Sequence, residues 1–223
     1  MLGVSKDDAV LDIGCGIGGA AFHIASTYGC FVHGLDLSVN MIMGALETSA
    51  DQTAKPSGCK VSFEVSDAEK REYGNEVYDA VFSRDVFLYV KDKERLLKNI
   101  YQCLKPGGRL VFTDYCAERA RGEESEAFVK YVQNKAFELA TVAEYEEMLG
   151  KAGFASWSVE RATEKLIDVT ETEIKNLDAA RDELIVNKSM STDNVDNLKN
   201  SWETRLQFAK DGEHSWAVFA VTK

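Results

Sequence analysis

The stretch VLDIGCGIGG, from Val10 to Gly19, decides the fold of this chain. It opens as a buried strand, with an apolar run broken only by Asp12, and passes into glycines at positions 14, 16 and 19. Glycines between a strand and a helix let the backbone approach a ligand closely, and the helix presents its N-terminus to the same place. The spacing also satisfies G-x-G-x-x-G, so it predicts a nucleotide site of either the nicotinamide or the S-adenosylmethionine type.

Strand-like and helix-like segments alternate around this stretch through the first half of the chain. Short apolar runs predict strands, and apolar residues at helical spacing predict the helices between them. The predicted strands are Ala9–Ile13, Phe31–Leu37, Lys60–Val65, Tyr78–Ser83 and Arg109–Thr113, and the predicted helices are Gly18–Tyr28, Ser38–Leu46 and Asp92–Leu104. This alternation is typical of a parallel, doubly wound α/β sheet, in which ligands bind outside the carboxyl ends of the strands.

The second half of the chain is mostly helical. Periodicity predicts helices over Glu123–Leu139, Thr141–Ala152, Thr170–Val186 and Asp193–Lys210, and strands over Ser156–Arg161 and Ser215–Thr222. We therefore expect a single Rossmann-like domain over residues 1–223, with seven strands and an antiparallel last strand. Within it we expect a cofactor-binding core at 1–117, a substrate-side helical insert at 118–210 and a closing strand at 211–223.

Composition excludes several classes of function. The 223 residues carry 26 Lys and Arg against 37 Asp and Glu, a net charge of −11, which disfavours nucleic acid and anionic membranes as partners. No apolar run reaches the ~18 residues of a membrane span, and the N-terminus lacks a signal-peptide pattern. The five cysteines form no C-x-x-C pair. We expect a cytoplasmic protein with reduced thiols and no metal site.

Three features resemble those of S-adenosylmethionine-dependent methyltransferases and so favour that cofactor over a nicotinamide: Asp12 inside DIGCG, the turn LKPGG at 104–108, and an expected reversed last strand. The loop amides from Gly14 to Gly18 suit the cofactor's carboxylate, and Asp12 suits its ammonium group or orients the loop. Asp36, at the end of the second strand with Leu37 beside it, suits the ribose hydroxyls. The adenine is expected at Asp67 and Ala68. The other loop residues assigned to the cofactor site are Gly14, Gly16 and Cys15, the last by small-residue packing.

Several segments together resemble the phosphoethanolamine N-methyltransferases. They are VLDIGCGIGG, GLDLSVNMI (34–42), SRDVFLYV (83–90), LKPGG (104–108) and TDYCA (113–117), and the resemblance runs from about Val10 to the C-terminus. It implies a methyltransferase fold and successive N-methylation of phosphoethanolamine towards phosphocholine. Two alternatives stay open: a methyltransferase for another small amine such as sarcosine or dimethylglycine, and a non-catalytic relative that binds the cofactor.

The resemblance also implies which residues form the site. Arg84 on the cofactor side and Asp85 near the methylated nitrogen match the family's SRD. The residues that match its substrate contacts are Tyr115 and Tyr131, with the basic phosphate ligands Lys135 and Arg205.

Two departures from the family pattern bear on the chemistry. Tyr89 stands where the family has a histidine, so we take Asp85 and Tyr89 as the candidate catalytic residues that accept the amine proton, Tyr89 through water. In the family that histidine pairs with a tyrosine on an N-terminal lid. Because the sequence begins shortly before the glycine loop, we expect the lid to be absent.

Overall fold

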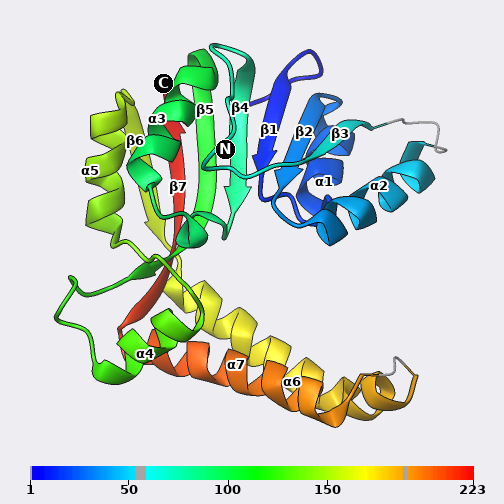
Figure 1. The fold of residues 1–223 in the computed structure, drawn as a ribbon, viewed down its shortest axis with the longest axis vertical. Coiled ribbons are helices and arrows are strands. Elements are labelled where there is room, and N and C mark those ends of the chain that lie inside the picture. The colour runs from blue at the N-terminus through cyan, green and yellow to red at the C-terminus, as the bar shows by residue number, and fades with distance from the viewer. Residues whose placement is uncertain (1, 54–58, 188–189) are drawn as a thin grey trace. The chain divides into compact units, whose positions relative to one another are not determined.

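The computed structural model describes residues 2–53, 59–187 and 190–223 (Figure 1). Strands and helices alternate through the first half, as the sequence predicts. In chain order the elements are β1 (Ala9–Ile13), α1 (Gly19–Tyr28), β2 (Phe31–Asp36), α2 (Val39–Thr53), β3 (Lys60–Val65), β4 (Tyr78–Arg84), the short 3₁₀ helix η1 (Phe87–Tyr89), α3 (Lys93–Cys103), β5 (Leu104–Ala117), α4 (Glu126–Asn134), α5 (Val142–Ala152), β6 (Ser156–Arg161), α6 (Thr163–Asn187), α7 (Thr192–Lys210) and β7 (His214–Thr222).

The strands form one seven-stranded sheet in the order β3-β2-β1-β4-β5-β7-β6. Strands β1 to β5 pair in parallel, and Val10 of β1 lies opposite Val32 of β2 on one side and Ala80 of β4 on the other. Strand β7 runs antiparallel to β5, so the predicted Rossmann-like sheet with a reversed last strand is confirmed. The strand order reverses at β1, where a doubly wound sheet places its ligand.

The chain separates into two compact units. Unit 1 comprises residues 1–114, 143–160 and 218–223, and unit 2 comprises residues 115–142 and 161–217. In unit 1 the rings of Phe112 and Phe219 stack with centroids 4.3 Å apart, and the buried Tyr145 packs against both. In unit 2 the helices α6 and α7 run side by side as a hairpin, linked by Arg181–Asp196 and Lys199–Asp178 ion pairs (Figure 1). The expectation of one domain with an insert stays a prediction.

Several predicted boundaries are wrong. Strand β5 begins at Leu104, whose backbone is already extended, so LKPGG lies within the strand and does not separate it from the helix. Helix α4 is shorter than predicted because Ala136, directly after its capping Lys135, takes a left-handed backbone conformation with φ of 53°. Helix α6 begins earlier than predicted, at Thr163. Within the ranges that the structure describes, no helix is long and apolar enough to cross a membrane.

Candidate functional site

The glycine loop leaves β1 and is pinned to the neighbouring strand. The backbone amides of Gly14 and Cys15 both donate to the carbonyl oxygen of Leu35, at 2.8 and 2.9 Å, and the amide of Gly18 donates to the carbonyl of Cys15. These three amides are therefore used inside the protein. The expectation that the loop amides from Gly14 to Gly18 bind a cofactor carboxylate stays a prediction.

The loop glycines at positions 14 and 16 both take left-handed backbone conformations, with φ of 73° and 54°. Their surroundings differ. A Cβ atom on Gly14 would lie 2.1 Å from a methyl carbon of Val86, whereas one on Gly16 would meet nothing within 4 Å. Open space beside Gly16 leaves room for a ligand to approach the backbone there.

This difference gives a stability prediction. We expect Gly14→Ala to lower the free energy of unfolding by about 3 kcal/mol, because backbone strain of ~1–2 kcal/mol adds to overpacking of ~1–3 kcal/mol. Gly16→Ala should cost only the strain. Urea unfolding of both variants checks this, with Gly16→Ala as the matched control. Equal losses in the two variants would contradict a role for the Val86 contact.

The acid at the end of β2 is joined to the loop. Asp36 accepts a hydrogen bond from the amide of Gly16 at 2.9 Å with one carboxylate oxygen, and from the amide of Ser38 at 2.8 Å with the other. Two residues that the sequence assigned to one cofactor site therefore touch. The side chain of Leu37 is 72% exposed, so an apolar surface lies next to the acid. A carboxylate has further lone pairs and can still accept from ribose hydroxyls.

Asp12 is a buried acid with unused hydrogen-bonding capacity. Only 1% of the residue is exposed, and its Oδ2 atom has no hydrogen-bond partner in the described part of the chain. Burial raises the pKa of Asp12 to about 7, and the negative charge of Asp36 adds to the rise while Arg84 opposes it. Arg84 itself is exposed at the end of β4. An unpaired carboxylate oxygen of this kind fits a cationic group of a ligand.

The turn after β3 is tied internally. Asp67 accepts from the amide of Glu69 at 3.0 Å and pairs with the exposed Lys70 at 2.7 Å, which holds the pKa of Asp67 below its usual range. The carbonyl of Ala68 accepts from the hydroxyl of Tyr73 at 2.9 Å. These contacts hold the turn in one conformation. The role of Asp67 and Ala68 in binding adenine stays a prediction.

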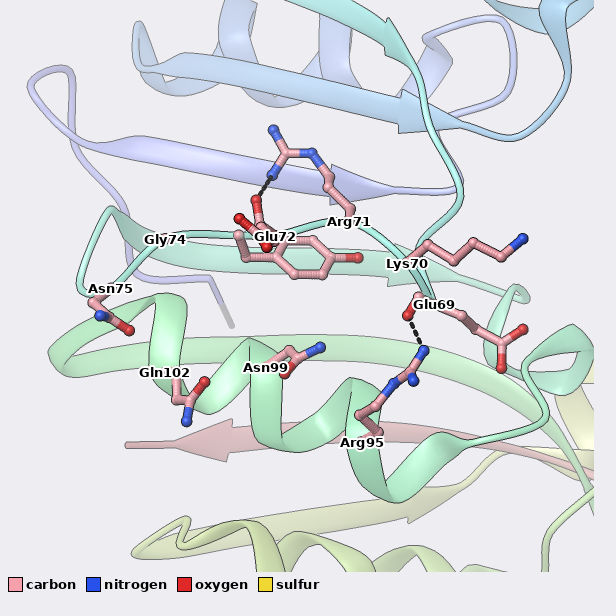
Figure 2. Close-up of a pocket in the computed structure, with 10 residues that line it drawn as sticks. Glu69, Lys70, Arg71, Glu72, Gly74, Asn75, Arg95, Asn99 and Gln102 are labelled. Atoms are coloured by element: carbon pink, nitrogen blue, oxygen red, sulfur yellow. Dashed lines mark hydrogen bonds between the residues drawn. The ribbon is translucent and has the colours of Figure 1, made fainter.

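A cavity of about 450 Å³ opens beside this turn, between the loop after β3 and helix α3 (Figure 2). The two arginines that line it are already held: Arg71 donates to the carbonyl of Glu72 and Arg95 to that of Glu69. Arg71 also pairs with Glu64. None of the residues that the sequence assigned to a site lines this cavity, so we do not place the site there.

Asp85 carries the clearest sign of a functional position. Its φ of 57° is left-handed, which is uncommon for a residue other than glycine and often marks an active site. The half-buried side chain accepts from the hydroxyl of Thr113 at 2.8 Å, and its amide donates to the Thr113 carbonyl at 2.9 Å. Strands β4 and β5 therefore fix this carboxylate at their carboxyl ends.

Tyr89, the other candidate catalytic residue, ends η1 and is 56% exposed. Partial burial and the nearby negative charges of Asp114 and Asp85 raise the pKa of the Tyr89 phenol. The phenol therefore keeps its proton at neutral pH and cannot take the amine proton directly. Between the two candidates, the geometry favours Asp85 as the proton acceptor, and a water-mediated role for Tyr89 stays a prediction.

Asp114 belongs to this part of unit 1, but the sequence did not assign it to the site. It is fully buried, accepts from the hydroxyl of Tyr145 at 2.5 Å, and accepts from the amide of Leu88 at 3.1 Å. Asp114 thus fixes η1, which carries Tyr89. Burial is the main cause that raises its pKa to about 7. The signal in the sequence was an acid directly after a strongly apolar strand.

The raised pKa of Asp114 predicts a pH effect on stability. Asp114 keeps its proton up to about pH 7 in the folded protein, but only up to about pH 3.8 in the unfolded chain. The free energy of unfolding therefore falls as the pH rises between these two values, by up to ~1.4 kcal/mol per pH unit. Asp114→Asn can still accept from the amide of Leu88 with its Oδ1 and can donate to the Tyr145 oxygen with its Nδ2. Because asparagine does not titrate, the variant should flatten this slope and gain stability relative to the wild type at pH 8. Denaturant unfolding at several pH values tests this, and parallel curves would contradict it.

Four of the residues that the resemblance assigned to the substrate lie in unit 2, namely Tyr115, Tyr131, Lys135 and Arg205, whereas Asp85, also assigned to the substrate, belongs to unit 1. The guanidinium of Arg205 donates to the hydroxyl of Tyr115 at 3.0 Å and to that of Thr170 at 3.3 Å. Lys135 donates to Ser201 at 2.8 Å, and Ser201 precedes Arg205 by one helical turn on α7. One face of α7 therefore carries Arg205 itself and the hydroxyl group that Lys135 contacts. Tyr131 is nearly buried and belongs to an aromatic cluster with Phe128, Phe137 and Phe208.

The reversed last strand and the glycine loop joined to an acid define the Rossmann-like methyltransferase class of fold. A family model described as "Methyltransferase domain" matches residues 4–174, so the chain belongs to the methyltransferase domain family. Among the residues that the structure covers, no group of three or more His, Cys, Asp or Glu is placed to hold a metal ion.

Named relatives narrow this likeness. The chain is 37% identical to phosphoethanolamine N-methyltransferase 1 of Zea mays over all of its length and 42% of the relative, and 29% identical to the Plasmodium falciparum phosphoethanolamine N-methyltransferase over 99% of its length and 80% of the relative. A solved structure of Haemonchus contortus phosphoethanolamine N-methyltransferase 2, in complex with phosphomonomethylethanolamine and S-adenosylhomocysteine, superposes with a TM-score of 0.92 at 34% identity, over 100% of this chain and 50% of that one. The chain spans less than half the length of its plant relatives.

Proposed function

We propose that this chain is an S-adenosylmethionine-dependent N-methyltransferase that acts on phosphoethanolamine or its mono- and dimethyl forms. Membership of the methyltransferase domain family supports the reaction. The observation that carries the substrate assignment is the cluster of Arg205, Tyr115 and Lys135, because it offers cations and a hydroxyl to a phosphate group in an otherwise acidic protein. The relatives and the Haemonchus contortus complex agree with it.

The residues of unit 1 fit the cofactor. The unpartnered oxygen of Asp12 suits an ammonium group, Asp36 retains lone pairs for ribose hydroxyls, and space is open beside Gly16. Burial raises the pKa of the Cys15 thiol to about 12, so this thiol stays protonated and contributes only packing. When bound, S-adenosylmethionine supplies an electrophilic methyl group on a sulfonium centre.

The protein's own residues then position and deprotonate the amine. Primary amines have a pKa near ~10, so the substrate nitrogen enters protonated and lacks a lone pair. Asp85 is the proposed acceptor of that proton, and Arg205 and Lys135 are the proposed phosphate ligands. Orientation of this kind lowers the barrier by ~7–11 kcal/mol. General-base help typically accelerates a reaction 10²–10⁴-fold, which corresponds to ~3–5 kcal/mol. Positioning is therefore the larger part of the mechanism.

Methyl transfer from labelled S-adenosylmethionine tests the proposal directly. Phosphoethanolamine and its mono- and dimethyl forms are assayed separately from sarcosine and dimethylglycine, beside a calorimetric titration with S-adenosylhomocysteine. Turnover on a phosphorylated amine alone supports the proposal. Turnover on sarcosine or dimethylglycine alone would replace the substrate, and cofactor binding without turnover on any amine would favour a non-catalytic role.

We also propose a cytoplasmic location and a small-molecule amine as the partner. The five cysteines are all free thiols, which supports a reducing compartment. Nucleic acid and anionic membranes are not proposed as partners, because the net charge of −11 repels them.

A further inference from the structure

His214, the first residue of β7, is a fully buried histidine in unit 2. Three aromatic rings surround its imidazole: Tyr115 at 5.2 Å between ring centroids, and Phe128 and Tyr131 at 5.7 Å each. Two of these three residues are ones that the resemblance assigned to the substrate. The histidine therefore sits in the wall of the proposed phosphate-binding cluster, although no motif in the sequence points to it.

The imidazole leaves its hydrogen-bonding capacity unused. In the ranges that the structure covers, neither Nδ1 nor Nε2 has a hydrogen-bond partner, and the same holds for the buried Nε of Arg205. The Arg205 guanidinium also contacts Tyr115, the ring that packs against His214. A neutral imidazole has one N–H donor and one acceptor nitrogen. Two donors and one acceptor are thus left without partners around the Tyr115 ring.

Burying these donors and this acceptor costs free energy unless a ligand supplies their missing hydrogen-bond partners. An unpaired buried donor loses its hydrogen bond to water, and a phenylalanine would fill the same space among aromatic rings at no such cost. Arg205 lies beside Glu173 at 3.6 Å, so part of its charge is already balanced. Burial and the positive charge of Arg205 lower the pKa of His214 to about 3, so the imidazole is neutral at pH 7 and keeps a single N–H to donate.

We propose that His214 donates a hydrogen bond to the phosphate oxyanion of the substrate, next to Arg205, and so selects phosphorylated amines over unphosphorylated ones. The inference rests on the proposed function, since it assigns one more residue to that substrate site. An oxyanion has the lone pairs to accept from both orphaned donors, whereas an amine without an anionic group offers them no acceptor. His214 acts here as a specificity-determining residue and takes no part in the methyl transfer.

Calorimetry with phosphocholine and with choline, at saturating S-adenosylhomocysteine, tests the proposal. His214→Phe removes both nitrogens but keeps an aromatic ring, and it should weaken phosphocholine binding about tenfold, the worth of one hydrogen bond to a charged group. His214→Gln keeps a donor and should stay within about threefold of the wild type. His23→Phe, at an exposed histidine of α1, is the matched control. Unchanged phosphocholine affinity in His214→Phe would overturn the proposal, as would an equal loss of choline binding.

A second measurement separates this inference from the proposed function. The protein has three histidines, so imidazole NMR signals are assignable from His214→Gln and His23→Phe. Inorganic phosphate should shift the His214 signals and leave those of His23 unchanged. If phosphate shifts them while phosphocholine does not bind, the anion site stands and the proposed substrate is wrong. If phosphocholine binds while neither ligand shifts them, the proposed substrate stands and the role of His214 is wrong.

Discussion

An Asp85→Asn variant is expected to lose about 100-fold or more in kcat for methyl transfer, the lower end of what a general base contributes. Asparagine keeps the shape of the side chain and tolerates the left-handed backbone that Asp85 adopts, so the change isolates the loss of the proton acceptor. Affinity for S-adenosylhomocysteine should stay within about threefold of the wild type. Steady-state kinetics with the preferred amine, together with calorimetry, measures both quantities.

Two further variants make this test sharper. Thr113→Val removes the hydroxyl that donates to Asp85 and should lower kcat by about three- to tenfold, because the carboxylate loses one orienting contact. Asp85→Ala adds backbone strain of ~1–2 kcal/mol and should also lower the melting temperature. Wild-type kcat in Asp85→Asn would remove the carboxylate from the mechanism and leave the strained backbone as a purely structural feature.

Asp36→Ala should weaken binding of S-adenosylhomocysteine by about 30-fold or more. The carboxylate accepts from the amides of Gly16 and Ser38, so its removal frees the glycine loop and also deletes the proposed ribose contact. Hydrogen bonds to a charged group contribute ~1.5–3 kcal/mol, and ~1.4 kcal/mol corresponds to tenfold in affinity. Isothermal calorimetry gives the affinity directly.

The control must be an acid with a similar structural task away from the cofactor residues. Asp92 caps helix α3 by accepting from the amide of Arg95 at 2.9 Å. Asp92→Ala should cost about 1 kcal/mol of stability and leave cofactor affinity unchanged. Comparable loss of affinity in both variants would show that Asp36 acts only through stability.

The parts of the fold that local patterns determine could be predicted from the sequence. The strands Ala9–Ile13 and Lys60–Val65 were predicted with the bounds that the structure has, because apolar runs and glycine turns define them locally. The boundaries of β5 and α4 could not be predicted. They depend on Leu104 pairing with Tyr78 across the sheet and on the left-handed Ala136, which no local pattern encodes.

The site divides in the same way. Gly16 and Asp36 were assigned together from spacing and do touch. The partnership of Asp114 with Tyr145 joins residues 31 positions apart, and the burial of His214 among three rings depends on tertiary packing. Sequence spacing reveals a site that a single turn builds, and it is silent on side chains that long-range contacts assemble.

The division of the chain into two compact units bears on how such a protein can acquire new substrates. The residues proposed to hold the methyl donor, such as Asp12 and Asp36, belong to unit 1, and those proposed to hold the phosphate, such as Arg205 and His214, belong to unit 2. Mutations that remodel substrate choice therefore need not touch the residues that hold the donor. Directed evolution towards another amine should draw its substitutions from residues 115–142 and 161–217.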